Sequence, residues 1–589
     1  PLQVACLPPA RRSFRSSGPA GGEDMPDVIA DDLRDLLGPT AGGSASVSPE
    51  VESRAPSPSG GVRAMVGGAY EGAERFGHLA NWTPIIAPAN AEIIPDKPVM
   101  DARARDVVRN EGSIAGAVAL AKDHIAGEQY LLNAKPQSRV LFGTEDSVWE
   151  TEFADEVEAK FGLYADGEYH WCDAQRINTL TGLVRLAIGS FALTGEVLAS
   201  SEWMAADGRP YQSAVLMLDP DRLCNPNFSN YLPNIAGGVE RDRYGAPVAY
   251  HILDRHPSDW ISPRVGSYSL HWRRVMARKP NWGRRNILHV FEMQRPDQAR
   301  GVSELVSALS EIKMLKEFRK IELQRAVVAA TYAATIESDL PSGDVYATMG
   351  GADGQNPSIE WAETYLDGIA AYNDAAKALR VDGVKIPVLM PGTKLRIQAP
   401  GAESPLGETF ETSMLRHIAA SLGMSYEQLS RDFSKTNYSS GKAALGQTEL
   451  HLAARKKLVA DGTANFAYWG WFEEAVNKGH LETMKRSRMP SLYEGLNADA
   501  YCSCDWIGAG RGQVDEFKET QAATMRLRSM LSTHEYEIAR IHGKDWRRVA
   551  KQISRERDIF KELDLPSVYE TEPSNAENAA SGEPREASQ

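Results

Sequence analysis

The stretch from Val302 to Ser338 contains no proline or glycine, and it limits most strongly what this chain can fold into. Glutamate alternates with lysine and arginine along it, while apolar residues recur at spacings of three and four, at Leu305, Leu309, Ile312, Leu315 and Phe318. This pattern predicts one amphipathic helix. Such a helix would be roughly 55 Å long, at about 1.5 Å per residue, whereas the mean helix of globular proteins has only about 11–12 residues. It therefore needs neighbours along its length, from its own chain or from other subunits.

The rest of the chain predicts an α+β body between two tails that lack a hydrophobic core. Residues 1–60 and 566–589 have the composition of disordered segments, and Met25 is a candidate natural start. Alternating apolar runs bounded by turn residues predict strands, at Ser213–Leu218, Ala246–Leu253, Asn286–Met293, 384–390 and 394–400. Helical spacing predicts further helices, at Asp101–Gly127 with Asp101 as cap, Asp173–Ala199, Ser404–Met424, Gly441–Leu481 and Gln513–Leu565. The aromatic cluster of Trp469 and Trp471 is interpreted as helical core.

Composition excludes several classes of protein. A net charge of −14 and a pI of about 5.5 argue against tight, whole-surface binding to nucleic acid. No apolar run is long and uninterrupted enough to cross a membrane, so no membrane partner is expected. The cysteines are few and odd in number, which predicts free thiols rather than disulfides or a metal site, at Cys6, Cys172, Cys224, Cys502 and Cys504.

The stretch RDFSKTNYSSGKAAL, Arg431 to Leu445, raises the question of a nucleotide site, because a Gly-Lys pair at a helix start is typical of phosphate-binding loops. The template requires a leading glycine where this chain has Thr436, and a hydroxyl residue where it has Ala443. No hydrophobic strand leads into the segment. Ser439 or Ser440 is the expected helix cap, and the stretch is interpreted as a polar loop before a helix.

Other catalytic templates also fail. His534-Glu535 lacks the second histidine of a zinc protease at Ile538, and no nucleophile elbow is present. His170 is interpreted as part of a loop and cap before the following helix. We therefore expect no catalytic residue, no metal and no cofactor.

Six segments, in order between about Ala80 and Leu565, together resemble the lambda-type portal proteins of tailed phages. Single matches of this kind would be weak, but their common order is specific. They are Arg103–Pro136, Cys172–Ala199, Gly237–Trp260 (GGVERDRYGAPVAYHILDRHPSDW), Leu288–Leu305, Gly423–Leu445 and Gly510–Trp546.

The resemblance implies a fold with wing, stem, clip and crown regions. By order along the chain, these regions would be the wing at 61–300, the first stem helix at 301–338, the clip at 339–402, the second stem helix at 403–424, a tunnel loop at 425–445, a long helix and wing return at 446–500, and a helical crown at 501–565.

The resemblance also implies a homo-oligomeric ring, usually of twelve subunits, at one vertex of the capsid in the virion. Double-stranded DNA would enter through its channel, driven by the terminase large subunit, and leave through it into the tail. The implied protein partners are the major capsid and scaffolding proteins and the head-completion or tail adaptor proteins, and assembly would take place in the host cytoplasm.

The same resemblance implies that the opening stretch faces DNA, through Lys435, Thr436, Asn437, Tyr438, Ser439, Ser440 and Lys442. An acidic channel would repel phosphates and keep the duplex from sticking. Three alternatives for this stretch stay open from the residues alone: a DNA-facing loop, an NTPase using Ser440, Gly441 and Lys442, and a solvated loop in a generic scaffold protein.

Overall fold

The structure is a computed structural model, and it describes residues 81–332, 367, 380–381, 384–385 and 407–565, with short gaps at 206–207, 230–231, 262–269, 281–282, 435, 487–488 and 512–514. The expectations for 1–60, for most of 339–402 and for 566–589 lie outside these residues. The chain divides into two units, Pro1–Ile85, of which only residues 81–85 are described, and Ile86–Gln589. Every element below belongs to the second unit.

Two helices occupy the place of the single helix predicted at Asp101–Gly127. They are α1 (Ala89–Asn110) and α2 (Gly112–Ala126), and they are separated at Glu111, whose backbone is extended. The break lets Ala104 of α1 and Ile114 of α2 join one apolar cluster. Asp101 is not a cap, because it lies buried inside α1.

The helix predicted at Asp173–Ala199 is shorter in the structure. α5 covers Leu180–Thr194, and the hydroxyl of Thr179 caps it by accepting the Gly182 N–H. Gly195 ends it with φ 73°, and the following residues form strand β2 (Glu196–Trp203). Asp173 orders the loop before the helix, since its carboxylate accepts N–H groups of three residues between Gln175 and Asn178.

The strands predicted at 213–218, 246–253 and 286–293 are confirmed, and all named strand pairs are antiparallel. One sheet has the order β3-β2-β8, a second has β4-β5-β6-β7, and the pairs β1-β11 and β10-β9 stand apart. The remaining strand bounds are β1 Leu131–Ala134, β3 Ser213–Leu218, β4 Ile235–Ala236, β5 Val239–Arg241, β6 Pro247–Leu253, β7 Trp272–Met276, β8 Ile287–Phe291, β9 Arg380–Val381, β10 Val384–Lys385 and β11 Cys504–Ile507. Only the first two residues of the strand expected at 384–390 are described, and the strand expected at 394–400 lies outside.

The long helix predicted from Gly441 is present but composite. It begins three residues earlier, as α11 (Tyr438–Arg455), passes through a π-helical turn (Lys456–Ala460) and continues as α12 (Asp461–Asn477). Trp471 is fully buried, and its ring contacts Phe161 and Tyr164 of α4 (Ser147–Ala165). The interpretation of the aromatic cluster as core is therefore confirmed for Trp471. Trp469 is partly buried at the edge of the same core.

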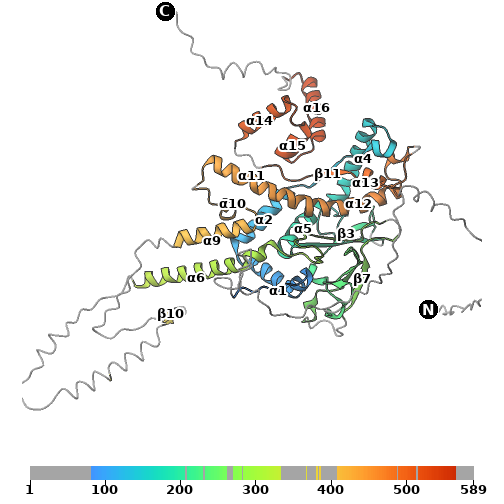
Figure 1. Ribbon diagram of the computed structural model, residues 1–589. Helices are drawn as coiled ribbons and strands as arrows, with labels where there is room; N and C mark the ends of the chain where they lie inside the picture. Colours follow the sequence, from blue (N-terminus) through green and yellow to red (C-terminus); the bar gives the residue numbers. More distant parts are fainter. Residues whose placement is uncertain are drawn as a thin grey trace, which may run out of the picture. The chain divides into compact units, whose positions relative to one another are not determined.

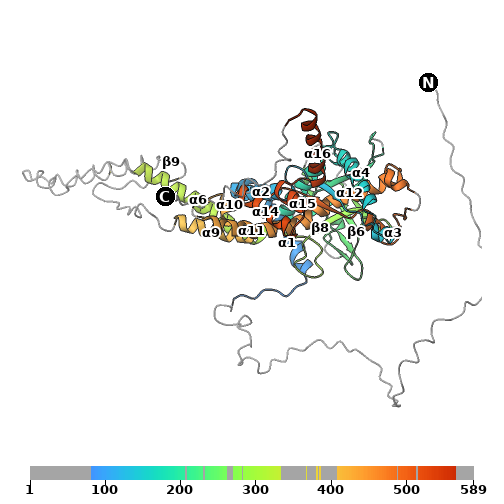
Figure 2. The same cartoon turned by 90° about the horizontal axis from the view of Figure 1, so that it is seen from above.

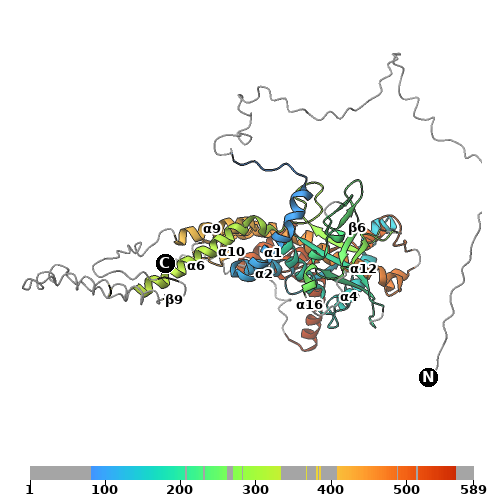
Figure 3. The ribbon, with the colours of Figure 1, turned by 90° about the horizontal axis from the view of Figure 1, so that it is seen from below.

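The predicted stem stretch begins with a 3₁₀ turn, η6 (Glu304–Ala308), capped by the Ser303 hydroxyl, before α6 (Leu309–Tyr332). The single helix predicted from Val302 is thus wrong at its start, and its end lies outside the described residues. α9 (Gly407–Ser421) runs beside α6 (Figure 1), and the views from above (Figure 2) and from below (Figure 3) agree. Phe318 and Phe410 contact each other between the two helices.

The C-terminal region is helical, as predicted, with α14 (Glu516–Arg528), α15 (His534–His542) and α16 (Trp546–Glu562). Short helices complete the description: α3 (Ser138–Phe142), α10 (Tyr426–Ser430) and α13 (Asn497–Tyr501). The described cysteines, Cys172, Cys224, Cys502 and Cys504, are free thiols. Among the described residues, no helix is long and apolar enough to cross a membrane.

Candidate functional site

The stretch predicted to face DNA divides into a short loop and a helix start. The region expected as a loop at 425–445 contains α10 and the first two turns of α11, so that expectation is too broad. Arg431, with φ 58°, ends α10. The cap of α11 is Asn437, whose side-chain oxygen accepts the Ser440 N–H at 2.8 Å. Ser439 and Ser440 are therefore not the cap but part of the first helical turn, because Asn437, two residues before Ser439, takes the cap position.

The structure places the candidate residues at the helix start with different exposure. Ser439, Ser440 and Lys442 are exposed, whereas Thr436 is half-buried and lies 3.4 Å from the Glu427 carboxylate. Lys435 lies outside the described residues, as does the side chain of Tyr438. The segment preceding the loop is the helix α10, not a strand. The geometry is thus unlike a strand–loop–helix nucleotide cradle, and it places the exposed Lys442 near the N-terminus of α11.

A groove of about 680 Å³ lies beside this loop, against α2, α6 and α9. Arg319 and Arg431 line it together with Glu411 and Asp432, and Arg319 forms an ion pair with Glu411 at 2.7 Å. The charges of the groove balance, so it offers no strong attraction to an anion.

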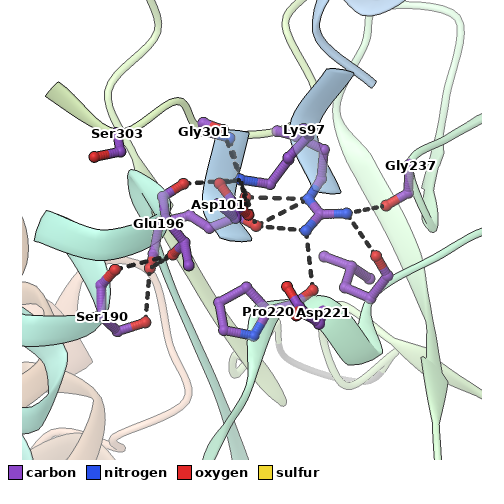
Figure 4. Close-up of polar contacts among 12 residues, drawn as sticks. Lys97, Asp101, Ser190, Glu196, Pro220, Asp221, Gly237, Gly301 and Ser303 are labelled. Carbon is purple, nitrogen blue, oxygen red and sulfur yellow. Dashed lines mark hydrogen bonds and ion pairs between the residues drawn. The ribbon is translucent and has the colours of Figure 1, made fainter. Parts of the chain in front are cut away.

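A second feature, which sequence reasoning missed, is a buried ionic cluster just before η6 and α6 (Figure 4). Glu196, the first residue of β2, is fully buried and forms an ion pair with Arg300 at 2.5 Å. Lys97 of α1 lies 3.4 Å from Glu196 and 3.1 Å from Asp101. His289 of β8 lies 3.1 Å from Glu196. The cluster therefore joins α1, β2 and β8 to the segment that leads into η6 and α6.

Arg300 uses its whole guanidinium group. Its Nε lies 3.1 Å from both carboxylate oxygens of Glu196. The terminal nitrogens donate to the carbonyl oxygens of Leu223 at 2.5 Å, Gly237 at 2.9 Å and Pro220 at 3.0 Å. A buried charge is tolerated when its hydrogen bonds are satisfied in this way.

The backbone crosses itself closely at the same place. The Gly301 N–H donates to Glu196 at 3.0 Å, and the Gly301 carbonyl accepts from Lys97 at 2.9 Å. A Cβ on Gly195 would lie 2.1 Å from the carbonyl carbon of Val302, and Gly195 also has a positive φ. Only glycine fits here, because both the conformation and the space exclude a side chain.

The protonation states follow from burial and charge. Burial alone would raise the pKa of Glu196, but Arg300 and Lys97 outweigh it and hold the pKa well below the usual range. Burial lowers the pKa of His289, against the opposing effect of Glu196. Burial also raises the pKa of Asp101 to about 6, although Lys97 opposes this. The cluster is a fixed anchor in which Glu196 is ionised and Arg300 neutralises it.

One signal in the sequence could have located the anchor. Glu196 interrupts an otherwise apolar run after a glycine, and Arg300-Gly301 immediately precedes the helix predicted from Val302. Their separation of over a hundred residues gives no hint of the pairing.

Three potential metal ligands also meet, namely Asp219, Asp221 and His256, with ligand atoms within 4.8 Å of one another. The Arg105 guanidinium lies between the carboxylates, at 2.5 Å from Asp221 and 3.2 Å from Asp219. It supplies the positive charge that a metal ion would bring.

The description "Phage portal protein, lambda family" matches residues 76–456, which is more than half of the chain. The chain belongs to this family. The resemblance predicted from the six segments and the α+β fold class are confirmed.

Individual relatives extend the match toward the C-terminus. Portal protein B of Escherichia phage lambda is 33% identical over 491 residues, covering 83% of this chain and 89% of that protein. The portal protein of Escherichia phage N15 is 34% identical over 481 residues, covering 82% and 88%. A probable portal protein of Halomonas phage phiHAP-1 is 21% identical over 501 residues, covering 83% and 86%.

Solved structures with similarity to the chain come from a gene transfer agent. A chain of the native virion particle matches 76% of this chain and 98% of its own length, with 12% identity and a TM-score of 0.35. A chain of the native neck, computed with C12 symmetry, matches 76% of this chain and 98% of its own length, with 12% identity and a TM-score of 0.36.

Proposed function

We propose that this portal protein forms a closed ring of about twelve copies at one capsid vertex, and that double-stranded DNA passes through the ring during packaging and ejection. Membership of the lambda portal family carries this proposal. The ring is a component of the virion. The proposed protein partners are the terminase large subunit, the capsid and scaffolding proteins, and the head-completion or tail adaptor proteins. The clip at 339–402 is the proposed docking region for the terminase and the adaptor proteins.

The outer surface of α6 supports ring formation. Met314 and Ile321, seven residues apart, share one side of the helix, and Leu323 and Val327, four residues apart, share another. Each is more than half exposed in the single chain. Two separate apolar sides on one helix suit a subunit that packs against two neighbours through different surfaces, as in a heterologous ring.

The start of α11 is the proposed contact to DNA. Lys442 is exposed there, and the N-terminus of α11 adds the positive end of a helix dipole. Each lysine–phosphate contact adds affinity through counterion release. A few such contacts in a chain with net charge −14 favour transient contact over firm binding.

Electron microscopy of the purified protein tests the ring. We expect class averages with rotational symmetry and a central opening wide enough for B-form DNA. A double substitution, Met314→Asp with Ile321→Asp, should reduce ring formation, whereas Lys485→Asp, at an exposed site far along the chain, should not. A stable monomer at high protein concentration, with no rings in any buffer, would overturn the proposal.

Substitution is a sharper test of the DNA contact than deletion, because deleting 435–442 would also remove the Asn437 cap. We expect Lys435→Ala with Lys442→Ala to leave rings and heads intact and to impair DNA packaging or retention in an infection assay. Lys485→Ala is the matched control. Normal packaging by the double variant would refute the assignment and favour a solvated loop in a scaffold protein.

A structural conduit without catalysis is the accompanying proposal. An NTPase would hydrolyse ATP and lose that activity in Lys442→Ala. We expect purified protein to show no hydrolysis that depends on Lys442.

A further inference from the structure

A cavity of about 420 Å³ combines a basic mouth with an aromatic wall. Its wall comes from α12 and the segment around α13, and its basic residues lie between β7 and β8. The side chains that matter here are Arg278, Arg284, Arg285, Phe466, Trp469 and Asp499.

The backbone holds two of the arginines side by side. Arg278 and Arg285 form an antiparallel bridge, and the Lys279 N–H donates to the Arg284 carbonyl at 2.8 Å. Residues directly opposite each other in such a bridge present their side chains on the same side. Both arginines are exposed.

The charge at the mouth is only partly neutralised. Arg284 is fixed by an ion pair with Glu473 and by a hydrogen bond to the Ser201 hydroxyl at 3.1 Å. For Arg278, the interaction within the described residues is a 3.4 Å hydrogen bond to the Gly283 carbonyl. No carboxylate of the described part of the chain pairs with Arg278 or Arg285. In a chain of net charge −14, this is a local excess of positive charge beside an aromatic wall.

The chemistry of the cavity selects an acidic peptide with an apolar side chain. Guanidinium groups bind carboxylates in a bidentate geometry. The wall of Phe466 and Trp469 gains from an apolar or aromatic group, which a phosphate backbone does not provide. A duplex would contact the mouth but leave this wall uncovered.

The chain itself contains a segment with this composition. Residues 566–589 carry five glutamates and one arginine. Val568 and Tyr569 are followed by Glu570 and, after Thr571, by Glu572. The segment follows α16, and its 24 residues can span up to about 80 Å at roughly 3.3 Å per residue. The charge of the segment therefore suits a basic cavity, and its length lets it extend well beyond α16.

We propose that the cavity beside Arg278 and Arg285 binds the acidic C-terminal segment of this chain, in the same or a neighbouring copy, with Tyr569 against Trp469 and the glutamates at the arginines. This would tie the end of the chain to the β7–β8 region.

Site-specific cross-linking in the full-length protein tests the proposal. A photoreactive phenylalanine analogue replaces Tyr569, and the cross-linked peptides are mapped by mass spectrometry. We expect cross-links to the peptide that contains Phe466 and Trp469, with a yield at least several-fold lower in Arg278→Glu/Arg285→Glu. Glu570→Arg/Glu572→Arg should lower it equally, and combining both pairs should restore it.

Matched controls separate specific binding from general charge effects. Arg103→Glu/Arg109→Glu changes two exposed arginines of α1 and should leave the cross-link unchanged. Cross-links that map elsewhere, or that survive reversal of the cavity charges, would overturn the proposal. So would binding of a fluorescent DNA oligonucleotide that depends on Arg278 and Arg285 and displaces the cross-link, because the cavity would then be a nucleic-acid site.

Discussion

Removing the carboxylate of Glu196 should destabilise the protein more than any surface substitution of the same type. Glu196 is fully buried, and Glu196→Ala would leave Arg300, which is 7% exposed, and Lys97, which is 6% exposed, without their shared counter-charge. The Gly301 N–H would also lose its acceptor. The perturbation therefore acts at the point where the chain enters η6 and α6.

The magnitude follows from the geometry. Breaking a buried ion pair by deleting one partner costs about 3–5 kcal/mol, because the remaining charge stays buried without compensation. Glu196→Gln keeps the shape of the side chain and one oxygen acceptor but also removes the counter-charge, so we expect a loss at the lower end of this range, about 3 kcal/mol.

The chain offers a matched control at the surface. Glu240 accepts a hydrogen bond from Arg274 Nε at 2.7 Å, but Arg274 is 46% exposed. Exposed pairs of this type contribute little to stability, because water and salt screen the two charges. Glu240→Ala thus removes the glutamate of an arginine–glutamate pair at the protein surface. The Arg274 guanidinium that remains can be hydrated by solvent.

Urea unfolding at one fixed protein concentration measures both variants, with hydrogen exchange as a local readout. Fixed concentration matters because assembly stabilises the folded subunit. We expect a much lower urea midpoint for Glu196→Ala and faster exchange of amides in η6, while Glu240→Ala stays close to the unsubstituted protein. If the two alanine variants lost equal stability, the anchor would not contribute as described.

Three further outcomes are expected. Burial raises the pKa of Glu158 to about 7, although a backbone hydrogen bond and a nearby arginine oppose it. A raised carboxyl pKa costs stability as pH rises from about 4.5 to 7, so the free energy of unfolding should fall over that window by on the order of 1–3 kcal/mol. In Glu158→Gln this fall, measured from urea unfolding at each pH, should be smaller. Asn437→Ala should cost about 1 kcal/mol and speed amide exchange in the first turn of α11, whereas Ser439→Ala should have little effect. Gly195→Ala should prevent accumulation of soluble folded protein, because its Cβ would collide with the backbone of Val302. Gly116→Ala lies in open space inside α2 and should raise the free energy of unfolding by about 0.5–1 kcal/mol. Equal effects of the two alanine substitutions would contradict the close approach of the backbone at Gly195 and Val302.

The candidate site was only partly predictable. The small polar residues and Gly441 indicated a loop before a helix, and the structure has one. The position of the cap was not resolved, because asparagine and serine are both good caps and two serines follow Asn437. The end of α5 was missed because helical periodicity continues across Gly195 into the apolar residues of β2, and short apolar runs fit either structure.

The sequence by itself determined the family, the strands around Ser213–Leu218 and Pro247–Leu253, and the helical character of Leu309–Tyr332 and of the region after Glu516, since these depend on local spacing and on residues in order along the chain. The tertiary structure alone decided the break at Glu111, the π turn within the long helix, and the pairing of Glu196 with Arg300. Each of these depends on partners distant in sequence: packing decides where a helix bends, and burial decides whether a charge is a solvated side chain or an anchor.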